Sequence, residues 1–74
     1  MNEILRSIAA TSAGTIVDED EGVLITWNGG CTFNVFSLHD GRCLDAFTAE
    51  EQPGSPEAAE DHAREWLYLL NREQ

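Results

Sequence analysis

The sequence predicts a single small α+β domain with an N-terminal helix, an antiparallel β-meander of three to four strands, and a C-terminal helix packed on the sheet. Turn-forming residues separate short runs rich in β-branched and aromatic residues, and apolar residues recur at helical spacing near both ends of the chain. A length of 74 residues suits one hydrophobic core. Residues 1–74 are therefore expected to form one domain.

The central part of the sheet is expected within residues 22–48. Two turn sequences, Asn28-Gly29-Gly30 and His39-Asp40-Gly41, separate three strand-like runs. If the first loop has three residues, Trp27 lies opposite Cys31, and period-two alternation assigns one set of side chains to the core face. This set is Val23, Ile25, Trp27, Cys31, Phe33, Val35, Leu44 and Ala46. The other face is mostly polar but holds three large apolar side chains, which are Leu24, Phe36 and Phe47.

The N-terminal residues add a helix and an edge strand. Residues 2–11 have apolar side chains at helical spacing, with Asn2 as a candidate N-cap and Gly14 able to end the helix after Ser12. Residues 15–17 are expected to pair antiparallel with residues 22–27. The intervening acidic loop then lies at the same end of the sheet as the turn at residues 39–41.

A second helix is expected to begin at Pro56, with Ser55 as its N-cap. Its apolar stripe, which would face the sheet, consists of Ala59, Ala63, Trp66, Leu67 and Leu70. The expected core combines this stripe with the sheet, and its large members are Trp27, Phe33, Val35, Leu44 and Trp66.

The charge of the chain is strongly negative. Fourteen Asp and Glu residues stand against four Arg and no Lys, which gives a net charge of −10 and a pI near 4.2. Such a surface repels nucleic-acid phosphates and anionic lipids and attracts basic proteins. Direct nucleic-acid binding is therefore disfavoured. Two interpretations stay open: a charge that binds a partner, and an acidic composition without any charge-based role, as a GC-rich genome or a high-salt cytoplasm can produce.

No residue pattern predicts a catalytic site, a metal site or a bound cofactor. The acidic residues before Gly22 alternate as in a calcium loop, but Asn28 stands where the bidentate Glu of such a loop is required. His39 and Cys43 alone supply neither four zinc ligands nor an oriented Cys-His pair. Glycines 29 and 30 join two strands, whereas a phosphate-binding loop would open a helix. The protein is therefore expected not to be an enzyme.

The cysteines and the hydropathy pattern predict the compartment. Cys31 and Cys43 would point to opposite faces of the sheet, so we expect two free thiols and a reducing cytosol. Near the N-terminus there is no basic segment followed by a long apolar run, and no window reaches about 18 apolar residues. We expect a cytoplasmic protein without a membrane anchor, either a monomer or a homodimer.

In size, net charge, order of elements and acid clusters, the chain resembles the small acidic inhibitors that phages and plasmids encode against host defence, namely anti-CRISPR proteins and DNA mimics. The resemblance covers the whole chain and rests on no specific motif. It implies a bacterial or archaeal host and a non-enzymatic inhibitor of a basic partner, such as a CRISPR effector or another nucleic-acid-binding protein.

Partner contacts would then come from the acidic clusters and from exposed aromatic side chains. The acidic candidates are Asp18, Glu19, Asp20, Glu21, Asp40, Glu50, Glu51, Glu57, Glu60, Asp61 and Glu65. Phe36 and Phe47 are the aromatic candidates, since they are assigned to the mixed face of the sheet. Either the N-terminal helix covers that face, or part of it is a protein-binding patch rimmed by acids.

The chain also partly resembles HicB antitoxins. The shared features are an acidic turn before a strand at residues 20–23, a Gly30-Cys31 element, and a later helix that opens Ser-Pro-Glu-Ala at residues 55–58. The chain departs from that pattern by an extra strand at residues 42–48 and by having no separate DNA-binding domain. An antitoxin role is the alternative that this resemblance implies.

Overall fold

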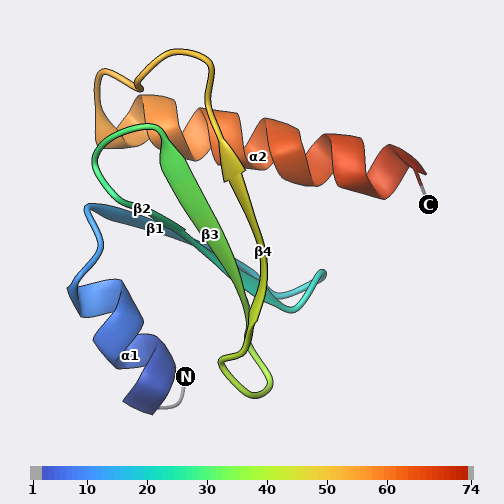
Figure 1. Ribbon diagram of the computed structural model, residues 1–74. Helices are drawn as coiled ribbons and strands as arrows, with labels where there is room; N and C mark the ends of the chain where they lie inside the picture. Colours follow the sequence, from blue (N-terminus) through green and yellow to red (C-terminus); the bar gives the residue numbers. More distant parts are fainter. Residues whose placement is uncertain (1–2, 74) are drawn as a thin grey trace.

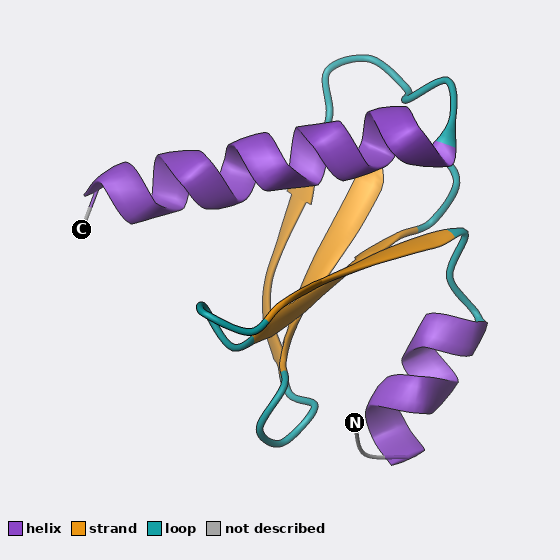
Figure 2. Cartoon of the chain, turned by 180° about the vertical axis from the view of Figure 1, so that it is seen from behind, coloured by secondary structure: helices purple, strands orange, loops and turns teal. Residues whose placement is uncertain are grey.

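The computed structural model describes residues 3–73, with side chains up to residue 70, and confirms the predicted α+β arrangement (Figure 1). Along the chain the elements are α1 (Glu3–Ala10), β1 (Gly14–Asp18), β2 (Val23–Trp27), β3 (Thr32–Ser37), β4 (Cys43–Thr48) and α2 (Pro56–Glu73). The four strands form one antiparallel meander in sequence order. Helix α2 crosses one face of the sheet, and α1 lies on the other side (Figure 2). The proposed cap of α1, Asn2, lies outside the described residues.

The pairing of β2 with β3 differs from the expected register by two residues. Trp27 pairs with Phe33 and Ile25 with Val35, so the loop is longer than the three residues expected. The Asn28 side chain explains this, because its Oδ1 accepts hydrogen bonds from the N–H groups of Gly30 at 2.8 Å and Thr32 at 3.3 Å. A shift of two residues leaves each side chain on its original face. The predicted core face of β2 and β3 is therefore confirmed, although the partners were wrong.

In β4 the predicted alternation is wrong, and a β-bulge is the reason. Val35 pairs with Asp45 and the next residue, Phe36, pairs with Cys43, so Leu44 is an extra residue without a partner on β3. A bulge reverses the facing of every residue that follows it. Phe47 therefore lies on the α2 side of the sheet. Leu44, expected in the core, is 49% exposed, and Ala46 is also exposed.

The main core lies between the sheet and α2. Ser55 caps the helix as expected, since its hydroxyl accepts the N–H of Ala58 at 3.2 Å and its carbonyl accepts the N–H of Ala59 at 3.0 Å. Small alanines let α2 approach the strands closely. The buried residues of this core are Ile16, Val23, Ile25, Trp27, Phe33, Val35, Ala49, Ala59, Ala63 and Leu67, with Phe47 and Trp66 partly buried against them.

Helix α1 covers part of the second sheet face. Leu5 of α1 and Leu24 of β2 are both fully buried, which makes β2 inaccessible on both faces. The helix also packs on the β3–β4 turn, where a Cβ added to Gly41 would lie 3.1 Å from Cγ2 of Ile4. Gly41 has a φ of 75°, which favours glycine at this position. The helix ends at Ala10, one residue before the end of the predicted range 2–11, and Gly14 is the first residue of β1.

Candidate functional site

Five acidic residues gather at one end of the sheet, and we call them the turn-end cluster. They are Asp18, Glu19, Asp20, Glu21 and Asp40. The N–H of Leu38 donates to the carbonyl of Gly22 at 2.9 Å, which joins the β1–β2 turn to the β3–β4 turn. The prediction that both turns lie at the same end is therefore confirmed. Within the first turn, the Asp18 carboxylate accepts the N–H of Glu21 at 3.0 Å.

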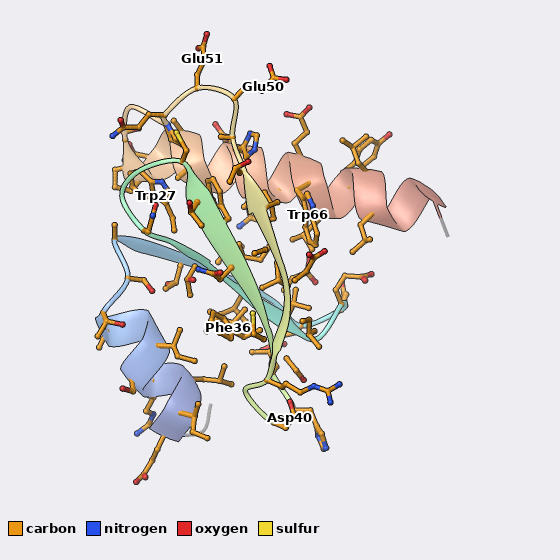
Figure 3. All side chains as sticks on the ribbon, in the orientation of Figure 1. Trp27, Phe36, Asp40, Glu50, Glu51 and Trp66 are labelled. Atoms are coloured by element: carbon orange, nitrogen blue, oxygen red, sulfur yellow. The ribbon has the colours of Figure 1, made fainter. Side chains whose placement is uncertain are left out.

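Asp40 is held in the β3–β4 turn by hydrogen bonds to its carboxylate (Figure 3). The N–H of Arg42 donates to Oδ1 at 3.0 Å, and this bond is the main reason that the pKa of Asp40 lies below its ordinary value of 3.8. The Ser37 hydroxyl and the nearby Arg42 and His39 charges act in the same direction, and partial desolvation opposes them. Asp40 thus remains charged to a lower pH than a free aspartate.

Four acidic residues form a second group along α2, and we call them the helix stripe. They are Glu57, Glu60, Asp61 and Glu65, all exposed. Glu57, Asp61 and Glu65 are spaced four residues apart, so they follow one another along one exposed side of the helix. Arg64 lies within the stripe and pairs with Glu60 at 3.5 Å, so it neutralises part of the charge there.

Glu50 and Glu51 lie in the connector between β4 and α2, and both point away from the body of the domain (Figure 3). The connector is tied to the rest of the chain by the N–H of Ala49, which donates to the carbonyl of Cys31 at 2.9 Å, and by the Gln52 side chain, which donates to the carbonyl of Gly29 at 3.1 Å. The connector lies at the end of the sheet away from the turn-end cluster (Figure 1). The predicted acidic residues thus form two separate surfaces.

The two aromatic candidates do not share a surface. Phe36 pairs with Leu24 on the α1 side, whereas Phe47 pairs with Phe33 on the α2 side. The Phe47 ring stacks on Phe33 at 4.9 Å and on Trp66 at 4.6 Å, which makes it part of the core. The expectation that Phe36 and Phe47 share one face of the sheet is therefore wrong, and the bulge at Leu44 is the physical reason.

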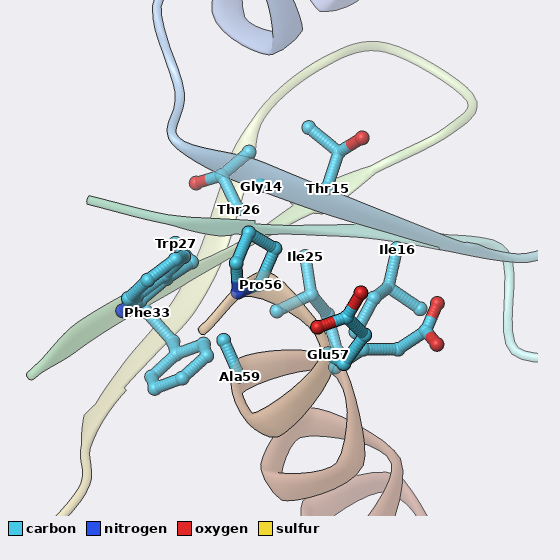
Figure 4. A pocket seen from close by; sticks show the side chains of 11 residues that line it. Gly14, Thr15, Ile16, Ile25, Thr26, Trp27, Phe33, Pro56, Glu57 and Ala59 are labelled. Atoms are coloured by element: carbon cyan, nitrogen blue, oxygen red, sulfur yellow. The ribbon is translucent and has the colours of Figure 1, made fainter. Parts of the chain in front are cut away.

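A pocket of about 160 Å³, which the sequence did not indicate, lies where α2 crosses β1 and β2 (Figure 4). Its apolar lining includes Ile16, Ile25, Trp27, Phe33 and Ala59, and two carboxylates of the helix stripe, Glu57 and Glu60, also line it. The Trp27 indole N–H donates to the carbonyl of Gly30 at 2.8 Å, which fixes the ring. Gly14 lines the pocket as well and has no side chain to fill it. Space of this kind arises from the crossing of two elements, so it leaves no pattern in either element alone.

The histidines and cysteines are not gathered at one site. His39 is exposed in a turn, whereas the His62 ring lies 5.3 Å from Phe33 and 5.9 Å from Phe47. Cys31 and Cys43 are both unbridged. Within residues 3–70, no three His, Cys, Asp or Glu side chains come together in a group that could hold a metal ion.

No protein-family model, curated protein or solved structure matches this chain. In the described part of the chain, neither helix is long and apolar enough to cross a membrane.

Proposed function

We propose that this chain is a non-enzymatic acidic protein that binds and inhibits a basic, nucleic-acid-binding protein in the cytoplasm of a bacterial or archaeal host. The partner class includes CRISPR effectors, and the mode of action is occupation of a surface that otherwise holds nucleic-acid phosphates. The helix stripe makes the principal contact, with Glu50 and Glu51 next to it. The turn-end cluster adds to the long-range attraction of the partner.

The observation that supports this proposal most is the spacing of the helix stripe. Its four carboxylates lie within nine residues of α2, and at a rise of about 1.5 Å per residue the first and last positions are about 12 Å apart along the helix axis. One strand of duplex DNA carries a phosphate about every 3.4 Å. The density of negative charge along the stripe is therefore close to that of one DNA strand, and a basic groove could bind it in a similar way. Arg64 neutralises part of this charge.

The helix that carries these charges is firmly held on the sheet. Ala59, Ala63 and Leu67 are buried against the strands, and Ser55 caps the first turn. Carboxylates on such a scaffold lose little conformational freedom on binding compared with those of a flexible acidic tail. Complementary charge of this type raises the association rate and suppresses binding to acidic partners.

A competitive pull-down from lysate of the native host tests the proposal. The tagged protein is immobilised, and bound proteins are identified by mass spectrometry after elution with short duplex DNA. The matched control is a bait in which the helix stripe is neutralised by Glu57→Gln, Glu60→Gln, Asp61→Asn and Glu65→Gln. The proposal expects a basic nucleic-acid-binding protein that duplex DNA elutes and that the control bait loses. Capture that neither DNA nor neutralisation alters would contradict it and favour an acidic surface without a charge-based role.

A further inference from the structure

We propose that the pocket between α2, β1 and β2 receives one arginine side chain of the basic partner, whose guanidinium group pairs with Glu57 and, in place of Arg64, with Glu60. This inference rests on the proposed function and specifies how the partner is recognised. In this arrangement the pocket gives the interface its specificity, and the other acidic residues attract the partner over a longer range.

The size of the pocket favours a single side chain. Its volume of about 160 Å³ is well below the roughly 300–1,000 Å³ of sites for drug-sized ligands. A cavity of about 150 Å³ holds one benzene molecule, which has six heavy atoms. An arginine side chain beyond its Cβ has a similar number of heavy atoms, so it matches the available space.

The lining combines an apolar wall with charge at one side. Ile25, Trp27 and Phe33 supply the apolar wall, on which the methylene groups of an arginine can pack. The two aromatic rings also suit a guanidinium, because its flat cation stacks on aromatic faces more readily than an ammonium does. Figure 4 shows the Glu57 carboxylate on the same side of the pocket as Ile16 and beside the apolar wall. A ligand with an apolar stem and a cationic end fits both parts.

An anionic ligand fits less well, although the pocket lies at the N-terminal end of α2. Pro56 has no N–H group, and the N–H groups of Ala58 and Ala59 already donate to Ser55. This end of the helix therefore offers an anion few free donors. The negative charges of Glu57 and Glu60 would also repel it.

Titration of the isotope-labelled protein with arginine side-chain analogues tests the inference without the partner. The probes are n-butylguanidinium chloride, 1-butanol and sodium butyrate at matched ionic strength, and the readouts are the amide resonances of Gly14 and Thr26 and the indole N–H of Trp27. We expect saturable shifts with the guanidinium at a dissociation constant roughly two- to fivefold lower than with butanol, the factor that exposed ion pairs supply. Butyrate should bind most weakly.

Two pairs of variants test whether the pocket and its two carboxylates are responsible for binding the cation. Glu57→Gln with Glu60→Gln should remove the preference for the cation, whereas Glu50→Gln with Glu51→Gln, an equal change of charge outside the pocket, should preserve it. Gly14→Leu should fill the pocket, because a Cβ at this position would lie 3.4 Å from Cε3 of Trp27, an ordinary contact. It should abolish the saturable shifts, and Gly54→Leu, at a site with nothing within 4 Å of the added Cβ, should not. Dispersed amide spectra verify that each variant is folded.

The inference is wrong if butanol or butyrate binds as tightly as the guanidinium, or if the cation shifts acidic residues over the whole surface without saturating at Gly14 and Trp27. The two proposals can fail separately. A partner that Gly14→Leu still captures at wild-type strength, but that the neutralised helix stripe loses, would remove the arginine pocket and leave the proposed function intact.

Discussion

The rings of Phe33 and Phe47 stack at a centroid distance of 4.9 Å, with their planes 2° apart. Phe47 also stacks with Trp66 of α2 at 4.6 Å, so a single side chain of the edge strand links β3 to the helix. Phe47 reaches this position only because the bulge at Leu44 turns the following residues towards α2.

Alanine substitutions should distinguish buried positions from exposed ones by the stability that each substitution removes. Phe33→Ala should lower the free energy of unfolding by about 3–5 kcal/mol, as for a fully buried phenylalanine. Phe47→Ala should cost less, because part of its ring is exposed. Leu44→Ala, at a half-exposed bulge position, should change stability by about 1 kcal/mol or less. Urea denaturation measures all three, and a larger loss for Phe36→Ala than for Phe33→Ala would show that the register is wrong.

Much of the fold could be predicted because short stretches of the sequence specify the turns, the start of α2 and the core face of the central strands. Asn28 and Asp40 mark the turns, Ser55 and Pro56 mark the start of α2, and alternation identified the core face of β2 and β3. The bulge could not be predicted in this way. It depends on how β4 fits a neighbouring strand and the turn before it, and the run Cys-Leu-Asp-Ala-Phe alternates equally well in either phase.

The candidate site was predictable in composition but not in arrangement. The acidic positions are evident from the sequence, but their division into two surfaces follows from the sheet topology, which places the turns and the connector at opposite ends. The pocket depends on the crossing of α2 over β1 next to Gly14. That glycine was interpreted as the end of α1, which is why its role in leaving space beside Trp27 was missed.

Gly41 should tolerate substitution poorly. Its φ of 75° costs a residue with a side chain about 1–2 kcal/mol, and a Cβ would also press on Ile4 of α1 at 3.1 Å. Gly41→Ala should therefore lower the melting temperature. Gly54→Ala, which has no positive φ and open space around its Cβ, is the matched control and should leave the melting temperature nearly unchanged. Equal melting temperatures for both variants would contradict the packing of α1 on this turn.

The charge of Asp40 should stabilise the β3–β4 turn in a pH-dependent way. The pKa of Asp40 is lower in the folded chain than its ordinary value of 3.8, so the carboxylate form favours folding. The stabilisation is fully present above the unfolded pKa and is lost as the pH falls through the lower folded pKa. The stability advantage of wild type over Asp40→Asn should thus be smaller at pH 2 than at pH 6. Chemical denaturation at both pH values checks this, and a difference that persists unchanged at pH 2 would refute the role of the charge.

Stability should not depend on a metal ion. The carboxylates at residues 18–21 lack the remaining ligands of a calcium loop, and Asp18 is already bonded to the N–H of Glu21. Thermal melts with EDTA, with millimolar calcium and without either should coincide. A large rise in melting temperature with calcium would identify this loop as a cation site.

The central claim is that fixed negative charge drives binding to a basic partner, and association kinetics across a range of salt concentrations test it most directly. The stripe variant and a turn variant, with Asp18→Asn, Glu19→Gln, Asp20→Asn and Glu21→Gln, each lose four charges, so their total charge is matched. Binding of wild type to the captured partner should weaken steeply as ionic strength passes about 0.15 M, where the screening length is about 8 Å. Both variants should associate more slowly at low salt, and the stripe variant should lose more affinity. If the complex is insensitive to salt and both variants bind as fast as wild type at low salt, the charge has no part in binding and the account is wrong.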